Sequence, residues 1–217
     1  MRLCNLWTSV VGCILGIGLF LTQVQASMVL QDYHAIFIHE ILADPASVGG
    51  DANGDGVVSS SQDEFIELYN PSTQAVDLSG WSISDSISLR HVFAEDSWID
   101  SESMFLVFGG GNPNFDISIF QEASTGGLSL NNGGDSVTLF DRNNLLIDSW
   151  VYGSEGGRDQ SLVKINGEIF LHTDIDSAHL FSPGVIMHAP SNAVPEPATL
   201  ALFGLGFIGA AVKRRFS

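Results

Sequence analysis

Short apolar or alternating runs fill the middle of this chain, and clusters of Gly, Asn, Asp, Ser and Pro separate them. Residues 141–144 lie between two such runs and are typical of a hairpin turn. No stretch of useful length between residues 27 and 194 repeats its apolar positions every 3.6 residues. Many short strands without helices predict an all-β, antiparallel sandwich or barrel. We predict strands at 35–42, 64–70, 81–84, 104–108, 136–140, 145–152 and 160–164.

The predicted strand 64–70 shows how its two faces differ. Alternation places Ile66 and Leu68 on one face and Phe65, Glu67 and Tyr69 on the other. The sequence offers Glu67 no evident partner, so we expect it on an edge or a solvated face. A functional carboxylate is the alternative.

The first 26 residues have the layout of an export signal. Arg2 precedes an apolar run at 6–21, and the segment closes on Val24-Gln25-Ala26, a small-x-small cleavage pattern. We predict a signal peptide at 1–26, removed by signal peptidase; an uncleaved membrane anchor is the alternative. The chain's two cysteines lie inside this segment. The mature domain therefore has no disulfide and must be held together by its core or by a metal.

The C-terminal end has the layout of a second targeting signal. Val194, Pro195, Glu196 and Pro197 precede an apolar run at 198–212, and the basic residues Lys213, Arg214 and Arg215 follow it. A helix over this run is about 22 Å long, which is short for a hydrocarbon core of about 30 Å. The basic cluster can snorkel and stop transfer at the cytoplasmic side.

This C-terminal layout resembles the PEP-CTERM sorting signal of Gram-negative bacteria. The resemblance implies that a membrane exosortase recognises residues 194–217 and processes the chain near the Pro-Glu-Pro motif. It therefore implies a short transmembrane sorting helix, a transient inner-membrane stage, and a final place at the cell surface, in the outer membrane or outside the cell.

The net charge of the chain limits the classes of molecule it can bind. The chain has 217 residues and a formal net charge of −17, and residues 27–194 hold 24 acidic but only four basic side chains. So acidic a body repels phosphate backbones, which excludes ordinary nucleic-acid binding. Its length suits one domain with a sizeable core.

Several motifs in the body resemble bacterial lamin-tail domains, in the same order. They are Ile-His-Glu-Ile-Leu at 38–42, Phe-Ile-Glu-Leu-Tyr-Asn at 65–70, Val-Asp-Leu-Ser-Gly-Trp at 76–81, Leu-Asn-Asn-Gly-Gly-Asp-Ser-Val at 130–137 and Phe-Ser-Pro-Gly at 181–184. The resemblance implies an immunoglobulin-like β-sandwich with Trp81 in its core. His39 stands where that family usually carries Asn. We therefore divide the chain into a signal peptide (1–26), a leader (27–35), a lamin-tail domain (36–184), a linker (185–193) and a sorting signal (194–217).

Residues 51–63 hold the sharpest local motif, Asp-x-Asn-x-Asp-Gly. It supplies side-chain oxygens at alternate positions and a glycine for the turn that wraps them around calcium. The loop resembles those of EF-hands and dockerins but has Gln62 at the twelfth position, so Asp63 or Glu64 must supply the missing acid. A metal-free turn is the alternative. The predicted calcium ligands are Asp51, Asn53, Asp55, the Val57 carbonyl, Ser59 and Asp63.

Catalytic signatures are weak. The six histidines are scattered without zinc-ligand spacing, and Gly-x-Ser-x-Gly is absent. We predict a non-enzymatic surface or extracellular-matrix protein that binds another protein or an exopolysaccharide. The alternative is a secreted metal-dependent hydrolase of phosphoesterase type, which requires several carboxylates or histidines converging in one pocket away from Asp51.

Overall fold

The computed structural model describes residues 36–115 and 120–189 of the chain. The predicted signal peptide, leader, sorting motif and basic cluster lie outside these residues. Within the described part, no helix is both long enough and apolar enough to cross a membrane.

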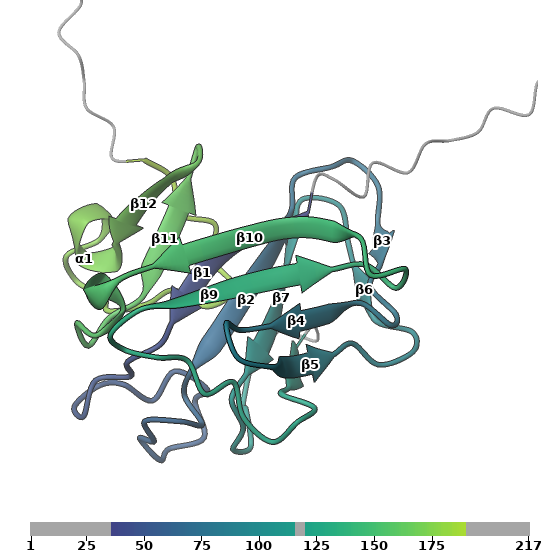
Figure 1. The fold of residues 1–217 in the computed structure, drawn as a ribbon. Helices are drawn as coiled ribbons and strands as arrows, with labels where there is room; N and C mark the ends of the chain where they lie inside the picture. Colours follow the sequence, from purple (N-terminus) through teal and green to yellow (C-terminus); the bar gives the residue numbers. More distant parts are fainter. Residues whose placement is uncertain (1–35, 116–119, 190–217) are drawn as a thin grey trace, which may run out of the picture. The chain divides into compact units, whose positions relative to one another are not determined.

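One of the two main layers is a six-stranded sheet (Figure 1). Its strands are antiparallel except for the last pair, β7 and β8, which run parallel. In spatial order they are β12 (Glu168–Leu171), β11 (Leu162–Ile165), β1 (Phe37–Leu42), β2 (Phe65–Asn70), β7 (Ser103–Phe108) and β8 (Phe120–Glu122).

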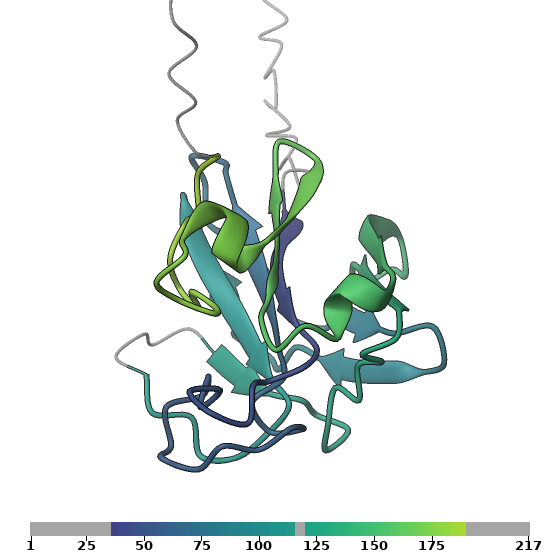
Figure 2. The same ribbon diagram turned by 90° about the vertical axis from the view of Figure 1, so that its left-hand side faces the viewer.

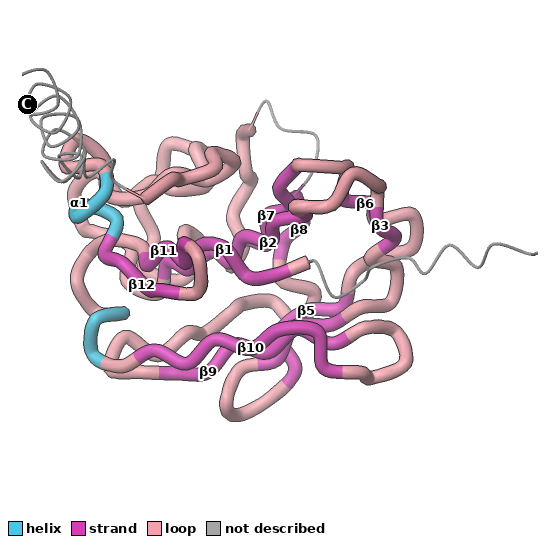
Figure 3. The backbone as a smooth tube through the Cα atoms, turned by 90° about the horizontal axis from the view of Figure 1, so that it is seen from above, coloured by secondary structure: helices cyan, strands magenta, loops and turns pink. Residues whose placement is uncertain are grey.

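The facing layer is a four-stranded antiparallel sheet, seen beneath the first in Figure 3. Its strands are β10 (Leu146–Tyr152), β9 (Asp135–Phe140), β4 (Ser82–Ser84) and β5 (Leu89–Val92). A short ribbon pairs β3 (Val76–Asp77) with β6 (Trp98–Ile99). In the described residues, helix is limited to the single turn α1 (His172–Ile175) and the 3₁₀ turn η2 (Ser154–Gly156). The domain is thus an all-β, immunoglobulin-like sandwich, as predicted.

The seven predicted strands are all present, with ends within two residues of the prediction. The hairpin turn at 141–144 is also confirmed, since the Asn144 N–H donates to the Asp141 carbonyl at 2.9 Å. The prediction missed β3, β5, β6, β8 and β12. These strands have two to four residues, too few to show an alternating pattern.

The main core lies between the two sheets. Strand β9 sends Val137 and Leu139 inward, while its alternate residues are only partly buried. Trp81 and Trp150 are the largest side chains that are fully buried, which confirms the core position expected for Trp81. Truncating one of these side chains would lose packing contacts and leave a cavity. The core between the two sheets therefore stabilises the strands that carry the polar sites.

The outer face of the six-stranded sheet is also covered. Loops lie over it in Figures 2 and 3. A second apolar cluster there joins Leu42, Phe65, Leu106 and Phe108 to side chains from the covering segments, among them Phe181. Strands β1 and β2 are therefore buried on both faces. For this reason the expectation of a solvated Glu67 is wrong: its side chain is completely buried.

Candidate functional site

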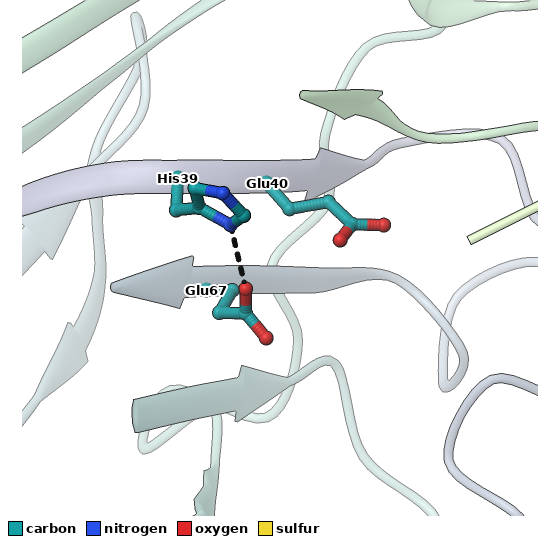
Figure 4. Close-up of side chains that lie close together, drawn as sticks. All are labelled: His39, Glu40 and Glu67. Atoms are coloured by element: carbon teal, nitrogen blue, oxygen red, sulfur yellow. Dashed lines mark hydrogen bonds and ion pairs between the residues drawn. The ribbon is translucent and has the colours of Figure 1, made fainter. Parts of the chain in front are cut away.

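Two polar sites stand out on this scaffold: the loop at 51–63 and a buried cluster of His39, Glu40 and Glu67 (Figure 4). The cluster arises from a β-bulge in β1. Ile38 pairs with Leu68 and Glu40 pairs with Glu67, which leaves His39 as the extra residue between the two pairs. A bulge breaks the two-residue alternation, so His39 and Glu40 can both lie near Glu67.

Glu40 is fully buried and has three hydrogen-bond donors. Its Oε1 accepts from Ser161 Oγ at 2.5 Å and from the Ser182 N–H at 2.9 Å. Its Oε2 accepts from Ser182 Oγ at 2.8 Å. Charge-assisted bonds of this kind stabilise a buried carboxylate.

Glu67 bridges the sheet to the same covering segment. Its Oε1 lies 2.9 Å from His39 Nδ1, and its Oε2 accepts a hydrogen bond from the Gly184 N–H. The His39 ring also faces Tyr69, at 6.1 Å between ring centroids, and the Met187 backbone. Both acids of the cluster therefore hold one segment, residues 180–187, against the sheet.

The segment presents its donors through a tight turn. The Val185 N–H donates to the Ser182 carbonyl at 3.0 Å, Pro183 occupies the second position, and Gly184 has a φ of +81°. Proline followed by a residue of positive φ is the pattern of a type II turn. Glycine is suited to that third position, and there its N–H reaches Glu67.

Burial dominates the electrostatics of the cluster. Loss of solvation raises the pKa of Glu67 well above its usual range, and the charge of Glu40 raises it further. Loss of solvation likewise lowers the pKa of His39, although Glu40 acts in the opposite direction. Both pKa shifts favour one proton shared between Nδ1 and Oε1 over two separated charges.

Of the described His, Cys, Asp and Glu side chains, only these three place ligand atoms together within 4.8 Å. They could hold a metal by distance alone. Their oxygens, however, already accept four hydrogen bonds from Ser161, Ser182 and Gly184, and His39 Nδ1 is engaged with Glu67. The four carboxylate oxygens of the cluster therefore all have partners, and His39 Nε2 is its one buried polar side-chain atom without a hydrogen bond.

The loop at 51–63 folds through hydrogen bonds from its own backbone. Asp51 Oδ2 accepts from the Gly56 N–H at 3.0 Å, and Asn53 Oδ1 accepts from the Asp55 N–H at 3.0 Å. Asp55 Oδ1 accepts from the Val57 N–H at 2.8 Å. These bonds bend the chain so that alternate side-chain oxygens lie on the inside of one turn.

Asp63 closes the loop. Its Oδ1 accepts from the Asn53 N–H at 3.0 Å and its Oδ2 from the Ser59 N–H at 2.7 Å. Burial raises the pKa of Asp63, and the charge of Asp51 adds to the shift. The carboxyl group of Glu64, by contrast, faces the backbone at Leu130 and Ser129, whose hydrogen bonding partly offsets the rise in its pKa that burial causes. Of the two candidate acids, only Asp63 therefore belongs to the loop.

One atom in the loop lacks a partner: Asp51 Oδ1 is buried and accepts no hydrogen bond. A buried carboxylate oxygen without a partner is costly, and a hard cation would satisfy it. The oxygen donors of the loop are of the type calcium prefers. Because Asp51, Asp55 and Asp63 do not all approach within 4.8 Å, a bound ion would have to draw at least one of them inward.

A neighbouring glycine run fixes the loop in place. Asn53 Nδ2 donates to the Gly110 carbonyl at 3.1 Å, and the Asn112 N–H donates to Asp55 Oδ2 at 3.1 Å. Gly111 has a φ of +90°, and a Cβ there would lie 2.4 Å from Asn53 Nδ2. A Cβ at Gly109 would lie 1.9 Å from the Ser61 carbonyl oxygen. Positions 109 and 111 must therefore stay glycine for the loop to pack.

Comparison with protein families decides the identity of the sandwich. The family model for the Lamin Tail Domain matches residues 31–154, more than half of the chain. The chain belongs to the lamin-tail domain family. No curated protein matches the chain.

The lamin-tail match contains β1, β2 and the 51–63 loop, but it ends before the segment that Glu40 and Glu67 hold. The covering turn of this lamin-tail domain therefore comes from further along the chain. A second family model, the PEP-CTERM protein-sorting motif, matches residues 193–215. This match confirms the sorting signal and indicates export to the cell envelope or surface and processing by an exosortase.

Sequence reasoning missed the buried cluster. Its signal was present: His39, Glu40 and Glu67 interrupt two otherwise apolar runs. What the sequence did not give was the bulge in β1 and the turn at 182–185 that together bring partners to the two acids.

Proposed function

We propose that this lamin-tail protein is a surface or extracellular-matrix component that acts by binding, and that one calcium ion stabilises its 51–63 loop. The ligands in this proposal are Asp51, Asn53, Asp55, the Val57 carbonyl, Ser59 and Asp63. The observation that carries the calcium site is the buried, unpartnered Asp51 Oδ1 inside a loop of oxygen donors. When bound, calcium would offset the repulsion among the three carboxylates.

Calorimetric titration of the full-length chain, solubilised in mild detergent, tests the site. We expect one calcium with a dissociation constant of about 10⁻⁴–10⁻³ M, the usual range of extracellular modules. Asp51→Asn should weaken binding at least about tenfold, because it removes a formal charge while keeping an acceptor for Gly56. Asp96→Asn makes the same charge change at an exposed site outside the loop and should bind as the wild type does. No calcium binding by the wild type would leave the loop as a metal-free turn.

The arrangement of polar groups supports binding rather than catalysis. The cluster of His39, Glu40 and Glu67 is buried beneath residues 180–187, where a substrate has no access. An open depression of about 300 Å³ lies beside the half-exposed Trp98 and is lined by acids such as Glu95 and Asp100. In its lining, Gln121 Nε2 donates a hydrogen bond to Ser97 Oγ at 2.6 Å. Such a surface offers contacts but no nucleophile with an adjacent base.

The outer surface of the four-stranded sheet supports the same proposal. Leu89 and Val92 on β5, and Leu146 and Val151 on β10, are exposed apolar side chains. Another protein or a neutral exopolysaccharide could lie against such positions, whereas anionic polymers are repelled by the acidic body.

Location and processing are tested in the native host by fractionation, immunoblotting and mass spectrometry of the recovered chain. We expect a surface or extracellular species that begins near Ser27, after signal peptidase, and lacks Lys213, Arg214 and Arg215, after exosortase. An intact full-length chain at the cell surface would contradict the proposed double processing.

A further inference from the structure

The segment at residues 180–187 is held on the sheet by a polar cluster and by the packing of Phe181 in the second apolar cluster. Ser182 and Gly184 donate to Glu40 and Glu67, and Ser161 donates its N–H to the Leu180 carbonyl at 2.9 Å. The apolar part of the attachment is Phe181, which meets Phe65 edge-on at 6.5 Å and packs against the second apolar cluster. The attachment therefore depends on whether two neighbouring buried carboxylates can coexist.

We propose that the turn at 182–185 is a proton-operated clip: it stays closed while His39 and Glu67 share one proton and opens when that proton is lost. Opening frees the segment that leads to the sorting motif. The geometry supports this directly. Glu40 and Glu67 are cross-strand partners in a buried pair, and like charges directly opposite each other repel.

The charged and titratable groups facing the pair come from three strands. They are Glu40 on β1, Tyr69 on β2 and Lys164 on β11, whose charge lowers the pKa of His39. Lys164 is itself paired with Asp148 at 2.8 Å. Residues 180–187 carry no charged side chain. Nothing on the clip itself can therefore neutralise a second negative charge beneath it.

Counting protons gives the sign of the pH dependence. We take the open pair to be solvated, with the ordinary pKa values of 6.5 for His and 4.5 for Glu, so between these values the open state also binds one proton and pH has no effect. Above pH 6.5 the open pair loses its proton, whereas the raised pKa of Glu67 makes the closed pair release its proton at a higher pH. Closing then weakens up to about tenfold per pH unit. Below pH 4.5 the open pair binds two protons, and acid also favours opening.

Opening changes the reach of the chain toward the sorting motif. With the clip closed, six residues separate Met187 from Val194, and the seven steps from one to the other span at most about 25 Å. Releasing residues 180–187 adds a similar length. The clip therefore controls how far the folded module can stand from the site of processing.

Amide hydrogen exchange on the full-length chain in mild detergent tests the clip, with protection of residues 180–187 corrected for intrinsic rates. Between pH 6.5 and 8.5 we expect wild-type protection to fall at least about tenfold. Protection in the β9–β10 hairpin should not change, which separates clip opening from global unfolding. Glu67→Gln keeps an acceptor for Gly184 without a titrating proton, so its protection should change less than about twofold over the same range.

His39→Asn provides a second variant in case Glu67→Gln fails to fold. Asn binds no proton, so the loss of protection should begin near pH 4.5 instead of 6.5. Each sample is measured with and without chelator. The proposal is overturned by wild-type protection that is independent of pH or by an alkaline loss that persists in Glu67→Gln. It is also overturned by protection that depends on chelator when the calcium loop is removed by Asp51→Ala and Asp55→Ala, which would mean that the cluster holds a metal.

Discussion

The 51–63 loop and the His39–Glu40–Glu67 cluster are two acidic sites built in opposite ways. The loop takes its ligands from thirteen consecutive residues and satisfies most of them with its own N–H groups. The cluster takes acids from β1 and β2 and donors from Ser161, Ser182 and Gly184, more than a hundred residues further along the chain. The loop can therefore form from a contiguous sequence motif, whereas the cluster exists only once the fold has brought distant residues together.

The difference extends to how each site manages its negative charge. In the loop, the unpartnered Asp51 Oδ1 is an acceptor that a bound cation would satisfy. In the cluster, every carboxylate oxygen has a donor, and a single proton relieves the repulsion. We therefore expect the loop to respond to calcium and the cluster to respond to pH.

The largest expected effect removes the support shared by both sites. Trp81→Ala should lower the free energy of unfolding by about 3–5 kcal/mol, because it empties a fully buried aromatic position in the main core. Chemical denaturation measures the loss. Trp98→Ala, at a half-exposed position, is the control. An unchanged midpoint for Trp81→Ala would show that Trp81 does not support the core.

His91, a buried histidine outside both sites, allows acid destabilisation of the whole domain to be distinguished from opening of the clip. Burial lowers the pKa of His91 to about 4, against an ordinary value of 6.5, so its contribution to stability should be complete above pH 6.5 and fall by about 3 kcal/mol as the pH drops to 4. Burial raises the pKa of Glu64 to about 7, and that group acts in the opposite direction between pH 4.5 and 7. The clip pair contributes no slope between pH 4.5 and 6.5. His91→Gln should remove this acid-side loss, seen as a difference from the wild type in unfolding free energy that changes between pH 6.5 and 4, and His188→Gln, at an exposed site, should not. An acid-side loss that survives in His91→Gln would assign it to another group.

Truncating Glu40 tests the distributed site. Glu40→Ala should cost about 2–3 kcal/mol, because the buried Ser182 N–H loses its acceptor and two serine hydroxyls must rotate to find others. Glu168→Ala, on the exposed side of β12, should stay within about 0.5 kcal/mol of the wild type. Equal losses in urea denaturation for the two variants would mean that the cluster adds no stability.

The smallest expected effect belongs to the local site. At 10 mM calcium, with the affinity given above, binding should add about 1.4–2.7 kcal/mol and raise the melting temperature relative to chelator. Asp51→Ala combined with Asp55→Ala should remove the difference, and magnesium should give less because it prefers a small octahedral shell. Coinciding melting curves with calcium and with chelator would contradict the prediction.

The extent of prediction from sequence follows the same division between local and distributed features. Alternation located seven strands, and Asn144 and Asp141 formed the expected turn, because each feature depends on neighbouring residues. Asp63 rather than Glu64 completes the loop, which the sequence left open; strand β2 begins just after them, and their side chains have different partners. The prediction for Glu67 failed because alternation gives a face but not what covers it.

By itself, the sequence determined the class of fold, the sorting motif, the acidic character and the candidate calcium loop. These features depend on composition, on the alternation of apolar residues and on contiguous motifs, all of which can be recognised without knowledge of the fold. Only the tertiary structure decided that the outer faces of β1 and β2 are buried, that a bulge adds His39 to the pair of acids, and that the turn at 182–185 covers them. The physical reason is that burial and pairing of a charged side chain depend on residues distant in sequence, and folding alone brings them together.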